Sequence, residues 1–187
     1  NPFLGHESEQ WKMAETSKKV MVIGGGVGGL CAAFVAAERG HSVTLYEAGH
    51  VLGGNMRLAA FPPGKGDITN MVRAYIHRCE KDGVRIVLGQ EVTLELIRKE
   101  NPDAVIVATG AKPLVLPIEG IDQPEILSGS AVLDGTCAPG KKVLVVGGGM
   151  VGCEIAALLG EQEHEVDVIG TELFERRVDR GGRALVV

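Results

Sequence analysis

Two stretches of the chain combine a short β-branched run with a glycine cluster and an apolar, alanine- and leucine-rich segment. The first stretch begins with Lys19–Gly29 and the second with Lys142–Gly152. In each, an apolar run of four or five residues predicts a buried strand, and the segment after the glycines predicts a helix. A further β-branched run follows both helices. The pattern therefore predicts two strand–helix–strand units of an α/β fold.

The two stretches are copies of one another. They are related by a constant offset of 123 residues, from Gly24 to Gly147, and the same offset carries His41 onto His164. We predict the first helix at about residues 28–38, ending before Gly40, and the second at about 151–162. Each histidine precedes a predicted strand, so we interpret the pair as a turn feature and not as ligands.

The region between the copies predicts further elements of the same fold. Apolar residues at helical spacing predict an amphipathic helix over about 67–81, and β-branched runs predict strands at 84–88 and 104–108. Residues 112–139 carry four prolines and resemble an interdomain crossover. We therefore expect an N-terminal extension (1–17), a first lobe (18–112), a crossover linker (113–141) and a partial second lobe (142–187).

The glycines of each copy have the spacing of a dinucleotide-binding turn. Such a turn needs its first glycine for a tight bend, its second for close approach to a pyrophosphate and its third for helix–strand packing. Free N–H groups at the start of the helix then hold the phosphate charge. The candidate cofactor-binding glycines are Gly24, Gly26, Gly28 and Gly29 in the first copy and Gly147, Gly149 and Gly152 in the second.

The acid that follows the second strand differs between the copies. Glu47 lies 23 residues after Gly24, where a carboxylate accepts hydrogen bonds from ribose hydroxyls. The equivalent position in the second copy is Gly170. Arg176 is a candidate ligand for a 2′-phosphate, which favours NADP over NAD. A solvated basic turn is an equally good interpretation of Arg176, and Glu172 is an alternative acid.

Charge and composition exclude several classes of protein. The net charge is −5 and the sequence pI about 5.6, so neither nucleic acid nor an anionic membrane is an expected partner. Apolar runs are too short for a membrane helix, and residues 1–17 do not have the composition of a signal peptide. We therefore expect a cytoplasmic protein. The four cysteines form no closely spaced pair, which argues against a redox disulfide or a metal cluster within the chain.

The order of these segments resembles a known superfamily. Two strand–helix–strand copies, separated by a strand that ends in Ala108-Thr109-Gly110, are similar to the two-dinucleotide-binding flavoproteins of the glutathione reductase type. Asn1-Pro2, Leu52–Ala59 and Pro62–Lys65 more closely resemble the C-terminal half of the 2,4-dienoyl-CoA reductase, 2-enoate reductase and trimethylamine dehydrogenase family. The resemblance implies a Rossmann-like FAD- and NAD(P)-binding fold, truncated at Val187.

The resemblance also implies cofactors and a reaction. FAD would occupy the first site and NADP or NAD the second, and hydride would pass from NAD(P)H to FAD with no catalytic side chain in this segment. Electrons would continue to FMN and a 4Fe-4S cluster in a flavin-barrel domain that precedes this chain. Further implied cofactor contacts are Gly53, Gly54, Asn55, Arg57, Thr109 and Gly110. For Arg57, an exposed helix position is the alternative.

Three other interpretations stay open at this point. The chain could be a non-catalytic module that binds ADP where relatives bind FAD. It could be an interaction fragment with vestigial sites, whose exposed sheet edges favour homo-oligomers. A flavin-free NAD-dependent dehydrogenase would leave the second glycine motif and the Ala-Thr-Gly strand unexplained. The substrate does not follow from these residues.

Overall fold

The computed structural model describes residues 11–113, 117 and 119–170, and these form two compact units. The first unit contains the described residues up to Met56 together with Thr69–Ala111. The second contains Arg57–Ile68 and the described residues from Lys112 onward. The chain therefore enters the second unit for twelve residues, returns to the first, and then crosses over again. Helix α2 (Asn55–Leu58) spans the first of these crossings.

A four-stranded parallel sheet forms the centre of the first unit. Its strands are β1 (Lys19–Ile23), β2 (Ser42–Glu47), β3 (Arg85–Leu88) and β4 (Ala104–Val107), in the order β3-β2-β1-β4. This order places the carboxyl ends of β1, β2 and β4 at one edge. In an open parallel sheet, ligands bind outside that edge.

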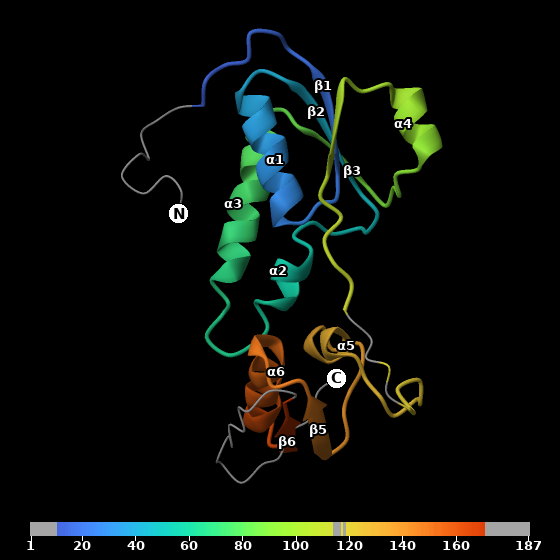
Figure 1. Cartoon of the computed structure of the whole chain (residues 1–187). Helices are drawn as coiled ribbons and strands as arrows, with labels where there is room; N and C mark the ends of the chain where they lie inside the picture. Colours follow the sequence, from blue (N-terminus) through green and yellow to red (C-terminus); the bar gives the residue numbers. More distant parts are fainter. Residues whose placement is uncertain (1–10, 114–116, 118, 171–187) are drawn as a thin grey trace. The chain divides into compact units, whose positions relative to one another are not determined.

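Two helices cover one face of this sheet. Helices α1 (Val27–Glu38) and α3 (Ile68–Lys81) lie beside one another there, and α4 (Leu94–Glu100) lies on the other side of the sheet (Figure 1). The contact between α1 and α3 is aromatic and ionic. The Phe34 ring meets Tyr75 edge-on at 5.3 Å, and the Arg78 guanidinium lies 3.8 Å from the centre of the Phe34 ring and pairs with Glu38.

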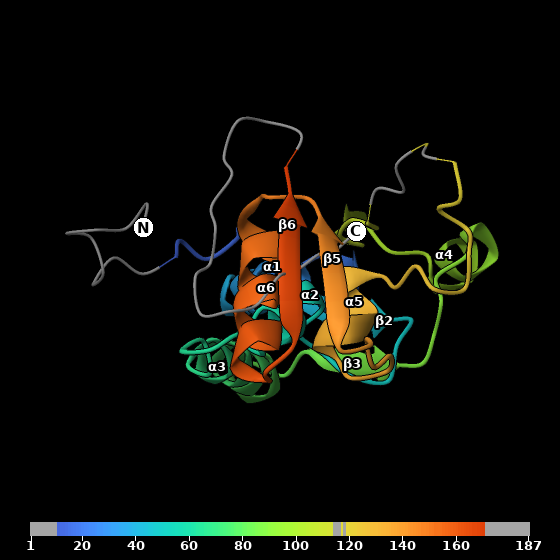
Figure 2. The same ribbon diagram turned by 90° about the horizontal axis from the view of Figure 1, so that it is seen from below.

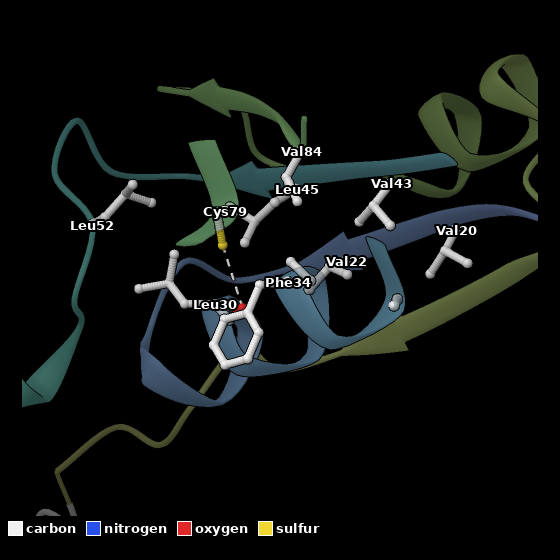
Figure 3. Close-up of a cluster of buried hydrophobic side chains, with 11 residues drawn as sticks. Val20, Val22, Leu30, Phe34, Val43, Leu45, Leu52, Cys79 and Val84 are labelled. Carbon is white, nitrogen blue, oxygen red and sulfur yellow. Dashed lines mark hydrogen bonds between the residues drawn. The ribbon is translucent and has the colours of Figure 1, made fainter. Parts of the chain in front are cut away.

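The buried core of the first unit lies between the sheet and these helices. Figure 3 shows its side chains pointing toward one another from β1, β2, α1 and the end of α3. The members include Val20, Val22, Leu30, Phe34, Val43, Leu45, Cys79 and Val84. The Cys79 thiol is fully buried and donates to the carbonyl oxygen of Leu30 at 3.4 Å. Burial raises the pKa of this thiol to about 11.

The buried thiol predicts a loss of stability at high pH. The folded chain keeps a proton on Cys79 that the unfolded chain releases above its ordinary pKa of 9.0. The protonated thiol therefore contributes its full stabilisation below pH 9. As the pH rises through 11, the free energy of unfolding falls by about 2 kcal/mol. Urea unfolding of wild type and Cys79→Ala between pH 8 and pH 11 measures this loss. Tyr46, whose pKa is also raised by burial, titrates in both proteins and cancels in the difference.

Cys79→Ala should be less stable than wild type at pH 8, because the side chain is lost from the core. The difference between the two proteins should shrink as the pH rises. A constant difference across this range would contradict a buried, high-pKa thiol.

The second unit repeats the start of the first. Strands β5 (Lys142–Val146) and β6 (Glu165–Ile169) pair in parallel and pack against α6 (Met150–Glu161) (Figure 2). Helix α5 (Gly129–Leu133) completes this unit. The core contains Leu133, Val145, Ile155, Ala156, Leu159 and Val166, with Leu58 packed against it.

Every strand and long helix expected from the sequence is present, within one or two residues. The α/β class with parallel strands is confirmed. Three short helices were not among the predicted elements: α2, α4, and α5, which lies inside the segment expected to be only a linker. Ser128 caps α5 by accepting from the N–H of Ala131, and Leu133 reaches the core of the second unit. This segment is therefore partly built into the second unit.

The copies match down to individual hydrogen bonds. The N–H of Gly24 donates to the carbonyl oxygen of Tyr46 at 2.8 Å. At an offset of 123 residues, the N–H of Gly147 donates to the carbonyl oxygen of Ile169, also at 2.8 Å. After each helix one residue adopts positive φ: Gly40 at 90° and Glu163 at 61°. Glycine tolerates that conformation, whereas glutamate does not do so without strain.

Glu163→Gly is therefore expected to raise the free energy of unfolding by about 0.5–1 kcal/mol. The backbone carbonyl that accepts from Lys141 is retained in this variant. Glu161→Gly, at the last residue of α6, serves as the control and should lower stability by about 0.5–1 kcal/mol. Chemical denaturation measures the free energy of unfolding of both variants. If Glu163→Gly destabilised the chain as much as Glu161→Gly, Glu163 would not be strained.

No helix in residues 11–113, 117 and 119–170 combines the length and apolar character needed to cross a membrane.

Candidate functional site

The first glycine loop joins β1 to α1 at the carboxyl edge of the sheet. Gly24 adopts φ 108°, which only glycine adopts readily, and so turns the chain from the strand into the loop. Gly29 lies against this turn, and a Cβ at position 29 would overlap the carbonyl oxygen of Gly24. The first and third glycines of the motif therefore do what their spacing predicted.

The start of α1 is left ready to bind an anion. Gly26 is the N-cap residue with extended backbone, and a glycine has no side chain to accept from the N–H groups of the first turn. That turn also holds no acidic side chain. A phosphate placed here would satisfy these donors and interact favourably with the helix dipole.

Glu47 ends β2 beside the loop, and its carboxylate is held by backbone N–H groups. Gly25 donates to Oε2 at 2.6 Å, and Gly49 donates to Oε1 at 2.7 Å. Each carboxylate oxygen keeps a further acceptor position, because a carboxylate has about four. Glu47 is thus oriented by the loop and can still accept from two ribose hydroxyls.

A second pair of glycines closes over the first loop. Gly53 donates its N–H to Gly25 at 2.8 Å and forms an isolated bridge with Gly26. Gly54, at φ 52°, approaches so closely that a Cβ there would lie 3.1 Å from the Cα of Gly26. Glycine at position 54 therefore lets the two backbone segments pack directly against one another.

The end of β4 completes the first site. The N–H of Ala108 donates to Ile23 at 2.8 Å, and a Cβ at Gly24 would lie 3.1 Å from the Cα of Thr109. The backbone at Thr109 and Gly110, where φ is 74°, thus follows immediately beside the first loop. The structure brings the glycines of the first loop, Glu47, Gly53, Gly54 and the backbone after β4 together at one edge of the sheet.

The second glycine loop has the same geometry, but a glycine takes the position of the acid. Gly147 adopts φ 129°, Gly149 caps α6, and a Cβ at Gly152 would overlap the Gly147 carbonyl oxygen. Gly170 follows β6 where Glu47 follows β2. Arg176 and Glu172 lie outside the described residues, so the choice between NADP and NAD stays a prediction.

Two predicted contacts have a less direct relation to the first site. Asn55 and Arg57 are exposed on α2, and Arg57 belongs to the second unit. There its charge lies near Asp134, whose carboxyl pKa is lowered mainly by hydrogen bonds from Thr136 and further by Arg57. A cofactor contact by Arg57 stays a prediction.

Two residues beside Glu47 were not predicted from the sequence: Gly25 and Gly49, which orient its carboxylate. Ala108, in the Ala-Thr-Gly segment, lies against Gly24. For Gly25 and Gly49, glycine next to an expected turn was the only sequence signal. Their partner became apparent only from the fold.

The described part of the chain was expected to hold neither a metal cluster nor a disulfide. No group of three or more metal-binding side chains gathers there. Cys31, Cys79, Cys137 and Cys153, which are all of the cysteines, are free thiols.

Comparison with known proteins agrees with this geometry. Residues 18–182 match the pyridine nucleotide-disulphide oxidoreductase family. Bilirubin reductase from Mediterraneibacter gnavus is 41% identical over 156 residues, which are 83% of this chain and 24% of that protein. Cinnamate reductase from Clostridium sporogenes is 42% identical over 170 residues, which are 90% of this chain and 25% of that protein.

A solved structure supports the same relationship. A 2-naphthoyl-CoA reductase superposes with a TM-score of 0.83 at 34% identity, covering 90% of this chain and 26% of the other. This chain thus spans about a quarter of the length of these relatives. The fold, both glycine loops and the family match agree: the chain belongs to the pyridine nucleotide-disulphide oxidoreductase family.

Proposed function

We propose that this chain binds FAD in the first site and NAD(P)H in the second. When bound, NAD(P)H would supply a hydride and FAD would accept it. The observation that carries the assignment of FAD to the first site is the Glu47 carboxylate, which is oriented beside the first loop by Gly25 and Gly49. In the second unit Gly170 takes the position of Glu47, which suits the exchangeable nucleotide, NADP in preference to NAD.

The protein residues bind and orient but do not perform acid–base chemistry in this proposal. The N–H groups at the start of α1 would hold the pyrophosphate of FAD, and those at the start of α6 would hold that of NAD(P)H. Glu47 would accept from the adenosine ribose hydroxyls. Gly53, Gly54, Thr109 and Gly110 would contact the cofactor through their backbone.

The proposal extends to a longer protein of which this chain is one part. Its relatives are about four times as long, and those named above are called reductases. We propose that electrons continue from FAD to FMN and a 4Fe-4S cluster in a flavin-barrel domain, which reduces an unsaturated organic substrate. The cluster and FMN would be held outside these 187 residues, and a cytoplasmic location would suit this chemistry.

Absorbance spectroscopy tests the first site. The purified chain is mixed with FAD, separated from free ligand and scanned from 250 to 550 nm, and the released ligand is identified by chromatography. A flavin band near 450 nm that stays with the protein supports the proposal. Retention of ADP with no retention of FAD would instead indicate a non-catalytic nucleotide-binding module. Retention of neither would overturn both assignments.

A further inference from the structure

Residues 57–68, here called the strap, join the second unit although the chain on both sides of them belongs to the first. Two contacts within the second unit anchor the strap. Leu58 packs against the core formed by β5, β6, α5 and α6. The Lys65 ammonium pairs with the Glu154 carboxylate on α6, and the two side chains are 38% and 25% exposed. The strap is thus attached at both of its ends.

The ion pair is not a requirement of the strand–helix–strand repeat. Glu154 lies on α6 two residues after Gly152, the third glycine of the second loop. In the first copy the equivalent residue is Cys31, and α1 packs there without a charged partner at that position. The first copy therefore shows that the loop and helix form without such a pair. In the second unit the pair joins the strap to α6.

The N-terminal end of the strap is continuous with the residues of the first site. Helix α2 contains Asn55 and Met56 of the first unit and Arg57 and Leu58 of the second. Immediately before it, Gly53 and Gly54 contact the first loop at Gly25 and Gly26. One short, continuous segment thus connects the glycines of the first site to the helix that begins at the second.

We propose that Lys65 and Glu154 are positioning residues that couple the two dinucleotide sites through the strap. This inference rests on the proposed function. A nucleotide bound at the start of α6 orders that helix, the ion pair holds the strap on it, and α2 holds Gly53 and Gly54 against the first loop. Because coupling between two binding sites is reciprocal, each nucleotide raises the affinity for the other by the same factor.

Titrations of the full chain test the coupling. FAD affinity is measured from quenching of flavin fluorescence, with and without saturating NADP⁺, which binds but supplies no hydride. We expect NADP⁺ to tighten FAD binding by about fivefold in wild type, the lower range of allosteric coupling. In Lys65→Met and Glu154→Gln this factor should fall to nearly one, with FAD affinity in the absence of NADP⁺ changed less than about twofold.

Two further variants separate coupling from general damage. The exchange Lys65→Glu with Glu154→Lys should restore most of the coupling, because the pair re-forms with opposite polarity. Lys142→Met removes an ion pair of the same unit, to Glu165 at 3.1 Å, and should leave the coupling unchanged. The proposal would be overturned if Lys65→Met and Glu154→Gln kept the wild-type coupling factor. It would also be overturned if Lys142→Met lost the coupling factor as they do.

Hydrogen exchange provides a readout that needs no ligand. The amides of Lys65 and Ile68 bond within the strap, to the carbonyls of Pro62 and Lys65. Both should exchange about threefold faster in Lys65→Met and Glu154→Gln than in wild type, as expected for loss of a partly exposed pair. Unchanged exchange would overturn the anchoring role. A wild-type chain that binds no FAD would overturn the proposed function, whereas binding of both nucleotides without coupling would overturn only this inference.

Discussion

Glu47→Gln is expected to weaken FAD binding by about 100-fold. The carboxylate accepts from Gly25 and Gly49 and has acceptor positions left for both ribose hydroxyls. A carboxamide has one acceptor oxygen, and its NH₂ group would face a backbone N–H donor in place of an acceptor. Loss of hydrogen bonds to a charged group costs about 1.5–3 kcal/mol each, and 100-fold corresponds to about 2.7 kcal/mol.

Fluorescence titration with FAD measures this effect, and thermal unfolding without ligand gives the separate cost to the loop. Glu91→Gln is the matched control. It removes one exposed carboxylate from the segment that follows β3 and should leave FAD affinity unchanged. Wild-type affinity in Glu47→Gln would exclude a ribose contact by this carboxylate and would remove the main support for FAD in the first site.

Gly29→Ala is expected to unfold the first unit or to destabilise it by at least about 3 kcal/mol. The new Cβ would overlap the carbonyl oxygen of Gly24, which is backbone in a tight turn and cannot move aside like a flexible side chain. Overpacking of this kind forces the helix away from the strand and disturbs the core behind it. Far-UV circular dichroism and urea unfolding of the chain report the loss.

The neighbouring glycine provides the control. A Cβ at Gly28 would meet nothing within 4 Å, and the residue is exposed in the first turn of α1. Gly28→Ala should therefore stabilise the chain by about 0.5–1 kcal/mol through helix propensity. Equal effects of Gly28→Ala and Gly29→Ala on stability would show that the close approach of Gly29 to Gly24 does not restrict position 29 to glycine.

Much of the first site could be predicted from local patterns. The glycine spacing indicated which residue turns the chain and which packs against the turn, because both requirements act within six residues. The position of Glu47 followed from the length of one strand–helix–strand unit. The repeat at an offset of 123 residues predicted the second loop, and the matching hydrogen bonds at Gly24 and Gly147 confirm it.

Other features had no local signal. Helix α4 spans only seven residues, and α5 only five, so periodicity could not separate them from loops. The N–H partners of Glu47 lie 22 residues before it and 2 after it, and only the folded loop brings them to one carboxylate. The sequence also gave no indication that the chain between α2 and α3 joins the second unit.

The sequence by itself determined the strands, the three long helices, the parallel arrangement and the two nucleotide loops, since strand and helix periods and glycine geometry are properties of neighbouring residues. The tertiary structure decided how Glu47 is oriented, that Ala108 and Thr109 lie beside Gly24, and that the strap is held by Leu58 and Lys65. These depend on contacts between distant segments. Lys65 and Glu154 are 89 residues apart, and only packing of the second unit brings the two charges together.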